Sequence, residues 1–259
     1  MGPHNGRTAL VTGGTSGIGL AVVRELATRG TAVFLCARNA EVVETTVKEL
    51  RAEGLNVAGT VCDVRDADAV RRTVEEAVAF GPIDILVNNA GRSGGGITAE
   101  IPEELWQDVL DTNLTSVFRT TQAVLNSGMP ERGWGRIINI ASTAGKQGVV
   151  YGAPYSASKH GVVGFTKALG LELAGSGVTV NAVCPGYVET PMAQRIRAGY
   201  AQHWEVTEDA VLTKFNAKIP LGRYSTPEEV AGLVGYLTTV TADAITAQAL
   251  NVCGGLGNF

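Results

Sequence analysis

The sequence predicts an α/β protein built on one doubly wound parallel sheet of about seven strands, with helices on both faces. Short apolar runs rich in Val, Ile and Ala alternate with longer helical stretches along the chain. Runs of this length and composition are typical of parallel strands that are buried on both faces. Strands that alternate with helices imply βαβ units with right-handed connections, and ligands then bind at the carboxyl ends of the strands.

Seven runs are expected to form the strands. In chain order they are TALVT (8–12), AVFLCA (32–37), NVAGTVCDV (56–64), IDILVNNAG (83–91), GRIINIAS (135–142), VTVNAVCPG (178–186) and AQALNVCGG (247–255). Helical patterns between them cover 17–29, 40–53, 66–80, 102–127, 155–174 and 226–238. A chain of 259 residues, 45% of them hydrophobic, suits a single domain over 1–259.

The stretch 187–224 departs from this alternation. It contains no clear strand and carries Tyr200, Trp204 and Phe215 among charged residues. This composition fits either a mobile helical lid over a binding site or an ordinary surface insertion. We predict a lid at 187–224 within the single domain.

Composition and charge exclude several other classes of protein. The net charge of −4 argues against nucleic acid as a partner. No apolar run reaches the length of about 18 residues needed to cross a membrane, and the N-terminus lacks a secretory signal. The three histidines show no metal-ligand spacing, so no metal site is expected. The cysteines are widely spaced and indicate reduced, buried thiols of a cytoplasmic protein: Cys36, Cys62, Cys184 and Cys253.

A glycine-rich turn between the first strand and the first helix indicates a dinucleotide site. Its spacing is Gly-x-x-x-Gly-x-Gly over residues 13–19. Glycines let the backbone approach a pyrophosphate, whose charge then lies at the helix N-terminus. A glycine cluster alone is weak evidence, but this one has the strand and helix that the site requires. The expected contacts are Gly13, Thr15, Ser16, Gly17, Ile18 and Gly19.

The second strand ends without the acidic residue that an NAD site usually places on the ribose hydroxyls. Arg38 follows it instead, which favours a 2′-phosphate and therefore NADPH/NADP+, although Arg38 also fits a solvated surface position. Asp63 and Val64, after the third strand, are expected near the adenine. The run 88–91, Asn-Asn-Ala-Gly, is expected to brace the sheet edge beside the cofactor, and either asparagine could be purely structural.

Tyr155 and Lys159 lie four residues apart, so they share one face of a helix. An ammonium beside a phenol lowers the pKa of the phenol, which would make Tyr155 a proton donor or acceptor near neutral pH. Ser142 can offer a hydroxyl to the same substrate oxygen. The spacing alone fits a chance pair on an amphipathic helix, and the other motifs favour the catalytic interpretation.

Together these residues resemble the motifs of the short-chain dehydrogenase/reductase family. The matching set is Thr12-Gly13-x-x-x-Gly17-x-Gly19, the run 88–91, Asn113, Ser142, Tyr155-x-x-x-Lys159 and Pro185-Gly186. The resemblance implies a Rossmann-type domain, a homotetramer packed through helices 102–127 and 155–174, and a catalytic tetrad of Asn113, Ser142, Tyr155 and Lys159. Further predicted cofactor contacts are Asn89, Ala90, Gly91, Tyr155, Lys159, Pro185, Gly186, Val188 and Thr190.

Three stretches, 91–96, 144–150 and 249–258, are similar to the ketoreductases of bacterial aromatic (type II) polyketide synthases. That resemblance implies NADPH-dependent reduction of one ketone, typically at C9, of a poly-β-ketone on an acyl carrier protein in antibiotic biosynthesis. In that group the residue before the paired glycines is usually proline, whereas here it is Ser93. Because the group ties this loop to stereochemistry, the handedness of the alcohol stays open, as do the chain length and the pathway.

The resemblance also implies roles for the site residues. Ser142 and Tyr155 would hydrogen-bond the carbonyl oxygen, where negative charge develops, and Tyr155 would donate the proton. Lys159 would lower the pKa of Tyr155 and bind the nicotinamide ribose, while Asn113 would anchor a water that connects Lys159 to solvent.

The expected substrate pocket has apolar walls with a few polar groups. Its candidate residues are Ser93, Gly94, Gly95, Ser142, Thr143, Gln147, Val149, Val150, Tyr155, Met192, Tyr200 and Trp204. Packing inside the core or the lid explains the larger ones equally well. Arg38, Arg65 and Arg92 could form a basic rim for a carrier protein or its phosphate, or could be ordinary solvated arginines.

Two other functions remain open at this point. One is a 3-oxoacyl-carrier-protein reductase, or another short-chain carbonyl reductase, on the same fold. The other is a catalytically inactive NADP-binding sensor or scaffold, against which the intact tetrad argues. Fold alone does not decide among them.

Overall fold

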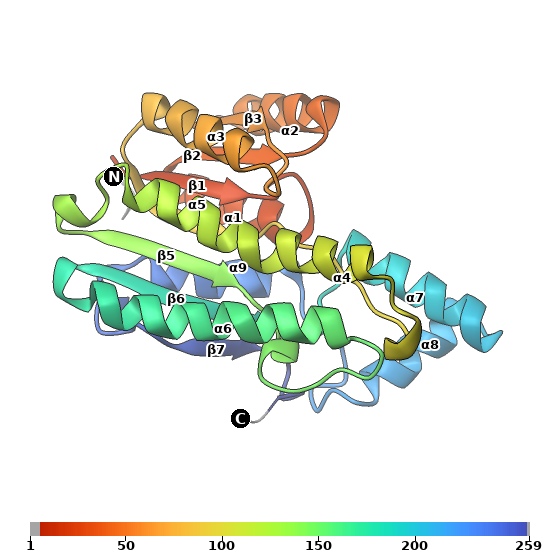
Figure 1. The fold of residues 1–259 in the computed structure, drawn as a ribbon. Helices are drawn as coiled ribbons and strands as arrows, with labels where there is room; N and C mark the ends of the chain where they lie inside the picture. The colour runs from red at the N-terminus through yellow and green to blue at the C-terminus, as the bar shows by residue number, and fades with distance from the viewer. Residues whose placement is uncertain (1–5, 258–259) are drawn as a thin grey trace.

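The computed structural model describes residues 6–257. Its centre is a seven-stranded sheet in the order β3-β2-β1-β4-β5-β6-β7, with every neighbouring pair parallel (Figure 1). The strands are β1 Thr8–Thr12, β2 Ala32–Ala37, β3 Val57–Val61, β4 Ile83–Asn88, β5 Gly135–Ile140, β6 Val178–Pro185 and β7 Ala249–Val252. The predicted fold class is confirmed, although several strands are shorter than expected because their last residues turn into the loops of the carboxyl edge.

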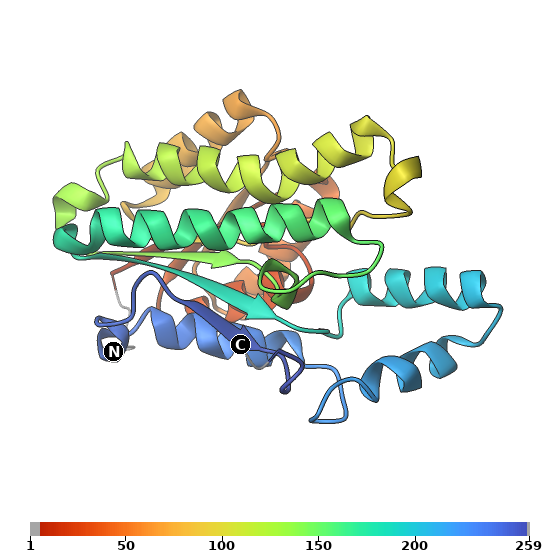
Figure 2. The same ribbon diagram turned by 60° about the horizontal axis from the view of Figure 1, so that its bottom comes forward.

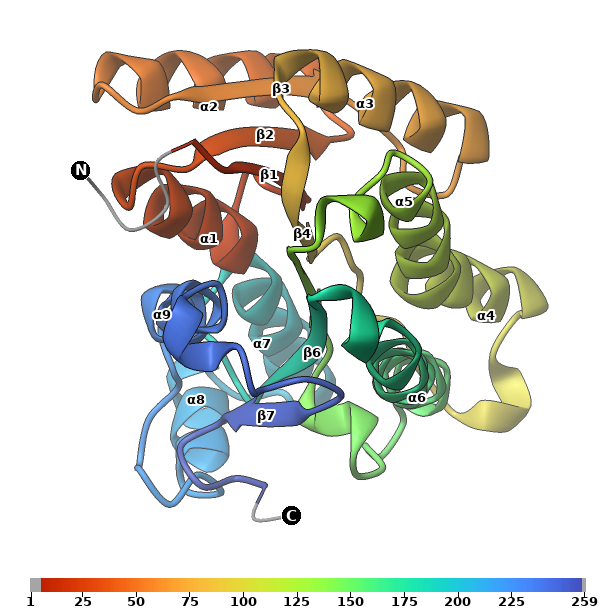
Figure 3. The same cartoon turned by 90° about the vertical axis from the view of Figure 1, so that its left-hand side faces the viewer.

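Helices cover both faces of the sheet. They are α1 Gly17–Thr28, α2 Ala40–Ala52, α3 Ala67–Phe80, α4 Glu103–Leu110, α5 Ser116–Leu125, α6 Ala153–Leu173, α7 Pro191–Trp204, α8 Glu208–Asn216 and α9 Pro227–Leu237. Viewed along the strands, α1 and α9 lie on one side of the sheet and α5 and α6 on the other (Figure 3). No helix within residues 6–257 is long and apolar enough to cross a membrane.

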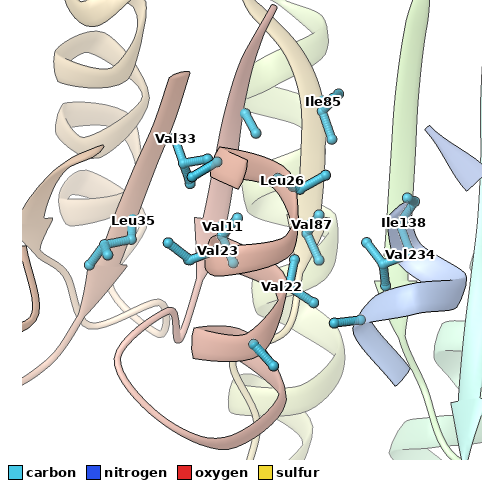
Figure 4. Close-up of a cluster of buried hydrophobic side chains, with 14 of the residues drawn as sticks. Val11, Val22, Val23, Leu26, Val33, Leu35, Ile85, Val87, Ile138 and Val234 are labelled. Carbon is cyan, nitrogen blue, oxygen red and sulfur yellow. The ribbon is translucent and has the colours of Figure 1, made fainter. Parts of the chain in front are cut away.

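The core follows from this layering. On the α1 and α9 side, Val22 and Leu26 of α1 and Val234 of α9 are fully buried against strand residues such as Val87 and Ile138 (Figure 4). A second cluster fills the opposite face, beneath α3, α5 and α6. The strands are therefore apolar on both sides, which explains why they form continuous hydrophobic runs in the sequence.

A buried polar chain joins two of these layers. The Asn88 amide donates to Thr121 Oγ1 at 3.0 Å and to Asn139 Oδ1 at 2.9 Å, and Asn139 donates to Thr166 at 2.9 Å. Neutral amides and hydroxyls this deep in a core are tolerated because they are paired. Asn88 is thus the structural member of the asparagine pair.

The helix expected over 102–127 is divided into three parts. Between α4 and α5 the chain forms a π turn over Asp111–Thr115, with the Asn113 side chain buried. A π turn inserts one extra residue into the helical register and often marks a functional position. Short turns of 3₁₀ helix cover Thr98–Glu100, Pro130–Arg132, Thr143–Gly145, Ala174–Ser176 and Val240–Ala242.

The stretch 187–224 forms α7 and α8, which project beyond the carboxyl ends of the strands (Figures 1 and 2). Tyr187, Phe215 and Tyr224 stack there, with ring centres 5.1 and 5.2 Å apart. The segment therefore has an aromatic core of its own. Residues 1–5, where the expectation about a secretory signal partly falls, and residues 258–259, with Asn258 of the stretch 249–258, lie outside the described residues.

Candidate active site

Ser142, Tyr155 and Lys159 meet at the carboxyl edge of the sheet. Ser142 follows β5 and caps the turn Thr143–Gly145, where its Oγ accepts the N–H of Ala144 at 3.1 Å. Tyr155 and Lys159 lie one turn apart on α6, with Lys159 Nζ 5.8 Å from the centre of the Tyr155 ring. The Ser142 hydroxyl hydrogen-bonds the phenol. The structure therefore brings these three predicted residues together.

Lys159 is buried, and its ammonium donates to the carbonyl of Ile140 at 2.8 Å. Desolvation lowers the pKa of Lys159 to about 8, because burial disfavours the charged form. A Cβ built on Gly91 would lie 3.8 Å from Nζ, so the chain leaving β4 passes beside the ammonium. Lys159 is thus positioned by the end of β5 and faces the loop after β4.

The expected lowering of the Tyr155 pKa is wrong for the cofactor-free protein. Burial raises the pKa of Tyr155 above its ordinary value, and the hydrogen bond from Ser142 only partly opposes this. Lys159 is not among the groups that lower the pKa of Tyr155, and its ammonium donates to the carbonyl of Ile140. The helical spacing correctly predicted that Tyr155 and Lys159 lie together. It did not predict that burial outweighs the nearby charge in setting the pKa of Tyr155.

Asn113 has a more definite position than its motif suggested. It lies in the π turn, where its Oδ1 accepts the N–H of Arg92 at 2.8 Å and its amide donates to Arg92 O at 3.0 Å and Ser158 Oγ at 3.1 Å. Ser158 in turn donates to Tyr155 O at 2.7 Å. Asn113 therefore clamps the loop after β4 to the helix that carries Tyr155, a contact that no sequence pattern reveals.

The glycine turn is close-packed as a pyrophosphate site requires. Gly13 and Gly17 have positive φ angles of 66° and 50°, and a Cβ on Gly19 would lie 2.1 Å from Gly13 O. Ser16 precedes α1 without capping it, so its hydroxyl is available at the helix N-terminus beside the half-buried Thr15 and Ile18. These observations fit a phosphate-bearing cofactor.

Asn89 braces that turn from the neighbouring strand. Its amide donates to Thr12 O and Gly13 O, both at 3.0 Å, while the Thr12 hydroxyl accepts the N–H groups of Asn89 and Ala90 at 3.0 Å. From the other side, a Cβ on Gly17 would lie 3.2 Å from Thr190. Thr190 caps α7 just past Pro185, Gly186 and the buried Val188, so the start of α7 closes over the turn.

Arg38 is exposed at the end of β2, and its charge helps to lower the pKa of Asp63, whose main partner is Arg65. The next residue, Asn39, caps α2 instead of supplying an acid. The position therefore suits a 2′-phosphate. Val64 is buried in a cluster with Cys36, Cys62 and Val70. All four cysteines are free and buried, as expected.

The loops at 93–96 and 149–152 are in direct contact. Gly96 N donates to Tyr151 O at 2.8 Å, and a Cβ on Gly95 would lie 2.0 Å from that oxygen. Tyr151 has a φ of 59°, an unfavourable value for a bulky residue. Its neighbours Val149 and Val150 are 45% and 77% exposed, and Ser93 is exposed as well. Sequence reasoning missed Tyr151, for which only the adjacent Gly152 gave a hint of a turn.

Two predicted pocket residues pack inside the 187–224 segment. Tyr200 lies 4.8 Å from Trp204 and 5.3 Å from Phe215, measured between ring centres. Met192, at the first turn of α7, is half-buried. Of the pocket candidates, Tyr200 and Trp204 therefore also serve the aromatic core of α7 and α8.

The loop after Ser142 is anchored to β7. Thr143 is buried and Gln147 is half-buried, and between them Lys146 Nζ donates to Ala249 O and Asn251 Oδ1, both at 2.9 Å. Two of the three arginines expected to form a basic rim are paired: Arg65 binds Asp63 and Asp108, and Arg92 also binds Asp108. No cluster of His, Cys, Asp or Glu in the described residues could hold a metal.

Several known proteins are similar to this chain along its whole length or nearly so. A candidate ketoacyl reductase of a monensin polyketide synthase from Streptomyces virginiae is 69% identical over 261 residues, which cover 100% of both chains. A crystal structure of an actinorhodin polyketide ketoreductase variant with NADPH is 59% identical, with a TM-score of 0.96 and 100% coverage of both chains. A 3-oxoacyl-acyl-carrier-protein reductase from Vibrio cholerae is 39% identical over 251 residues, 97% of each chain.

The family assignment follows from these similarities. A family model described as short chain dehydrogenase matches residues 7–201, which contain the glycine turn and the Ser142, Tyr155 and Lys159 site. With that match and relatives that align from end to end, the chain belongs to the short-chain dehydrogenase family.

Proposed function

We propose that this enzyme is an NADPH-dependent ketoreductase that reduces one ketone, at C9, of a poly-β-ketone held on an acyl carrier protein in aromatic polyketide biosynthesis. The observation that carries the proposal is the meeting of Ser142, Tyr155 and Lys159 beside a glycine turn with no acid after β2. The similarity to polyketide ketoreductases, at 59 to 69% identity over the full chain, supports the substrate class.

The residues of this chain handle the carbonyl oxygen. When bound, NADPH supplies the hydride for the ketone carbon. Ser142 and Tyr155 donate hydrogen bonds to the oxygen, where negative charge develops as the hydride arrives. Tyr155 then transfers its phenolic proton to that oxygen, which completes the alcohol. Because burial raises the pKa of Tyr155, the phenol stays protonated, as a proton donor must be.

Lys159 and Asn113 restore the proton. The ammonium of Lys159 stabilises the phenolate that remains on Tyr155 and binds the nicotinamide ribose. Asn113 Oδ1 accepts one hydrogen bond, from Arg92 N, and its second lone pair is the proposed anchor of a water that connects Lys159 to solvent.

The pocket is proposed to lie between the contacting loops and α7. Val149, Val150 and Tyr151 give it an exposed apolar rim, which suits a partly cyclised chain. The segment 187–224 acts as a lid on the single domain, since it projects over the carboxyl edge and has its own aromatic core (Figure 2).

The proposed assembly is a homotetramer in the cytoplasm. Exposed apolar side chains support packing between copies through α4 to α6: Trp106, Phe118 and Leu171 are 39%, 46% and 74% exposed. Four free, buried cysteines suit a reducing compartment.

The function is tested by following NADPH consumption with a fused bicyclic ketone and with a linear 3-oxoacyl thioester, with NADH as the control cofactor. We expect NADPH to be preferred and the bicyclic ketone to be reduced faster. Preference for the linear thioester would move the assignment to 3-oxoacyl-carrier-protein reduction. Binding of NADPH without turnover of either ketone would instead favour the sensor or scaffold.

Replacing Tyr155 with Phe removes the proton donor while it keeps the ring. We expect kcat to fall by about 10² to 10⁴-fold, the usual contribution of general acid catalysis, with NADPH binding retained. Steady-state turnover and NADPH fluorescence titration measure the two quantities. Near-wild-type turnover in the Tyr155→Phe variant would exclude this mechanism.

The lowered pKa of Lys159 predicts an alkaline limit to activity. Lys159 is charged below about pH 8 and loses its proton as the pH rises through that value, so kcat/KM for NADPH should fall there. Tyr155, whose pKa is raised, stays protonated over the same range. A Lys159→Arg variant keeps its charge at these pH values. It should be less active, but its kcat/KM should not fall as the pH rises through about 8. If kcat/KM falls at the same alkaline pH in both proteins, the fall does not come from Lys159.

The contact between Gly95 and Tyr151 predicts that a substitution at Gly95 impairs ketone reduction and leaves NADPH binding intact. A Cβ in Gly95→Ala meets a backbone oxygen at 2.0 Å, so the loop must shift, and we expect kcat/KM for the ketone to fall by up to about 100-fold. NADPH binding should not change. Gly148→Ala is the matched control, because a Cβ there meets nothing within 4 Å. Equal effects of the two substitutions would show that loop contact is irrelevant to the pocket.

A further inference from the structure

The hydroxyl of Ser158 lies between two parts of the active site. Ser158 is fully buried on α6, in the turn that carries Tyr155 and Lys159. Its Oγ donates to the carbonyl of Tyr155 at 2.7 Å and accepts the Asn113 amide at 3.1 Å. One side chain therefore connects the catalytic turn of α6 to the π turn over Asp111–Thr115.

The two bonds of Ser158 determine which end of the Asn113 amide it meets. A hydroxyl has a single proton, and that of Ser158 is directed at the Tyr155 carbonyl. Ser158 can therefore only accept from Asn113, so the amide must present its NH₂ group. The Arg92 backbone meets both ends of the same amide: its N–H donates to Oδ1 at 2.8 Å, and its carbonyl accepts from Nδ2 at 3.0 Å. A reversed amide would lose all three bonds.

The orientation of this amide matters for the proton supply. A Cβ on Gly91 would lie 3.3 Å from Asn113 Oδ1 and 3.8 Å from Lys159 Nζ, so both atoms border the same small space. The remaining lone pair of Oδ1 is the proposed anchor of the water between them. If the amide turned over, its NH₂ group would take this place, and an NH₂ group cannot accept a hydrogen bond from that water.

Packing holds the π turn against α6 at a second point. A Cβ on Gly161 would lie 2.6 Å from the Leu114 side chain. Leu114 follows Asn113 in the π turn, and Gly161 lies three residues after Ser158, on the same face of α6. The apolar contact therefore fixes how closely the two elements approach, while the hydroxyl fixes the orientation of the amide.

We propose that Ser158 is a positioning residue, whose hydroxyl holds the Asn113 amide in the orientation that proton supply to Lys159 and Tyr155 requires. The proposal rests on the proposed function, in which these residues restore the proton. Because Ser158 is fully buried, it acts through Asn113 and the backbone of Tyr155.

Thr166 provides a matched control, because it makes the same two kinds of bond on the same helix. Its Oγ1 donates to the Val162 carbonyl at 2.7 Å and accepts the Asn139 amide at 2.9 Å, and its side chain is fully buried. Thr166 lies about two turns beyond Ser158, beside the structural chain of amides in the core. Removal of either hydroxyl deprives one buried amide of a partner, so the two losses should destabilise the fold by similar amounts.

The test compares Ser158→Ala with Thr166→Val. In Ser158→Ala we expect kcat to fall about 2- to 10-fold, the fold-change that corresponds to one hydrogen bond, while KM for NADPH stays unchanged. The solvent deuterium isotope effect on kcat should rise, because proton supply then limits turnover more strongly. In Thr166→Val, kcat and the isotope effect should keep their wild-type values, although urea unfolding shows a comparable loss of stability.

A double substitution tests whether Ser158 acts through Asn113. With Asn113→Ala present, Ser158→Ala should lower kcat no further, because the two residues form one unit. An equal fall of kcat with and without Asn113 would overturn the proposal. Wild-type kcat and isotope effect in Ser158→Ala would overturn it as well, as would an equal fall of kcat in Thr166→Val, since loss of packing would then explain the effect.

Failure of the proposed function has a separate signature. Absence of turnover by the wild-type enzyme with both the bicyclic ketone and the linear thioester would count against that function, whereas the role of Ser158 is judged only from differences between active variants. If Ser158→Ala does not fold, Ser158→Cys replaces it, since a thiol is a weak hydrogen-bonding group. The same fall in kcat and the same dependence on Asn113 are then expected, and their absence would overturn the proposal.

Discussion

The active site depends on one joint between β1 and β4. The Asn89 amide holds the backbone carbonyls at the end of β1, and the Thr12 hydroxyl holds the first two N–H groups after β4. The glycine turn leaves from one side of this joint, and Gly91, Arg92 and the Asn113 clamp leave from the other. The glycine turn and the loop that Asn113 holds are therefore positioned by the same four hydrogen bonds.

Burial sets the charges at the site more than pairing does. Lys159 and Tyr155 are moved in opposite directions from their ordinary pKa values, and in both cases the neutral form is favoured. Proton donation needs a neutral phenol, whereas the amine of Lys159 is only partly protonated near pH 8.

The sequence predicted the parts of the molecule whose signals are local. Apolar runs gave the strands, and the turn at 13–19 and the pair Tyr155 and Lys159 were found by spacing alone or by family resemblance. Contacts between distant segments were not predictable in this way. The Asn113 clamp on Arg92 and the pairing of Arg65 with Asp108 join residues from different elements of the chain, so they depend on the fold.

The contact between the loops at 93–96 and 149–152 bears on how substrate preference can change. Tyr151 holds a conformation that suits glycine, and its carbonyl fills the space where a side chain at position 95 would stand. Position 95 therefore cannot accept a side chain unless the loop at 149–152 moves. A related loop that carries a side chain at position 95 would fit this scaffold only together with its own partner loop.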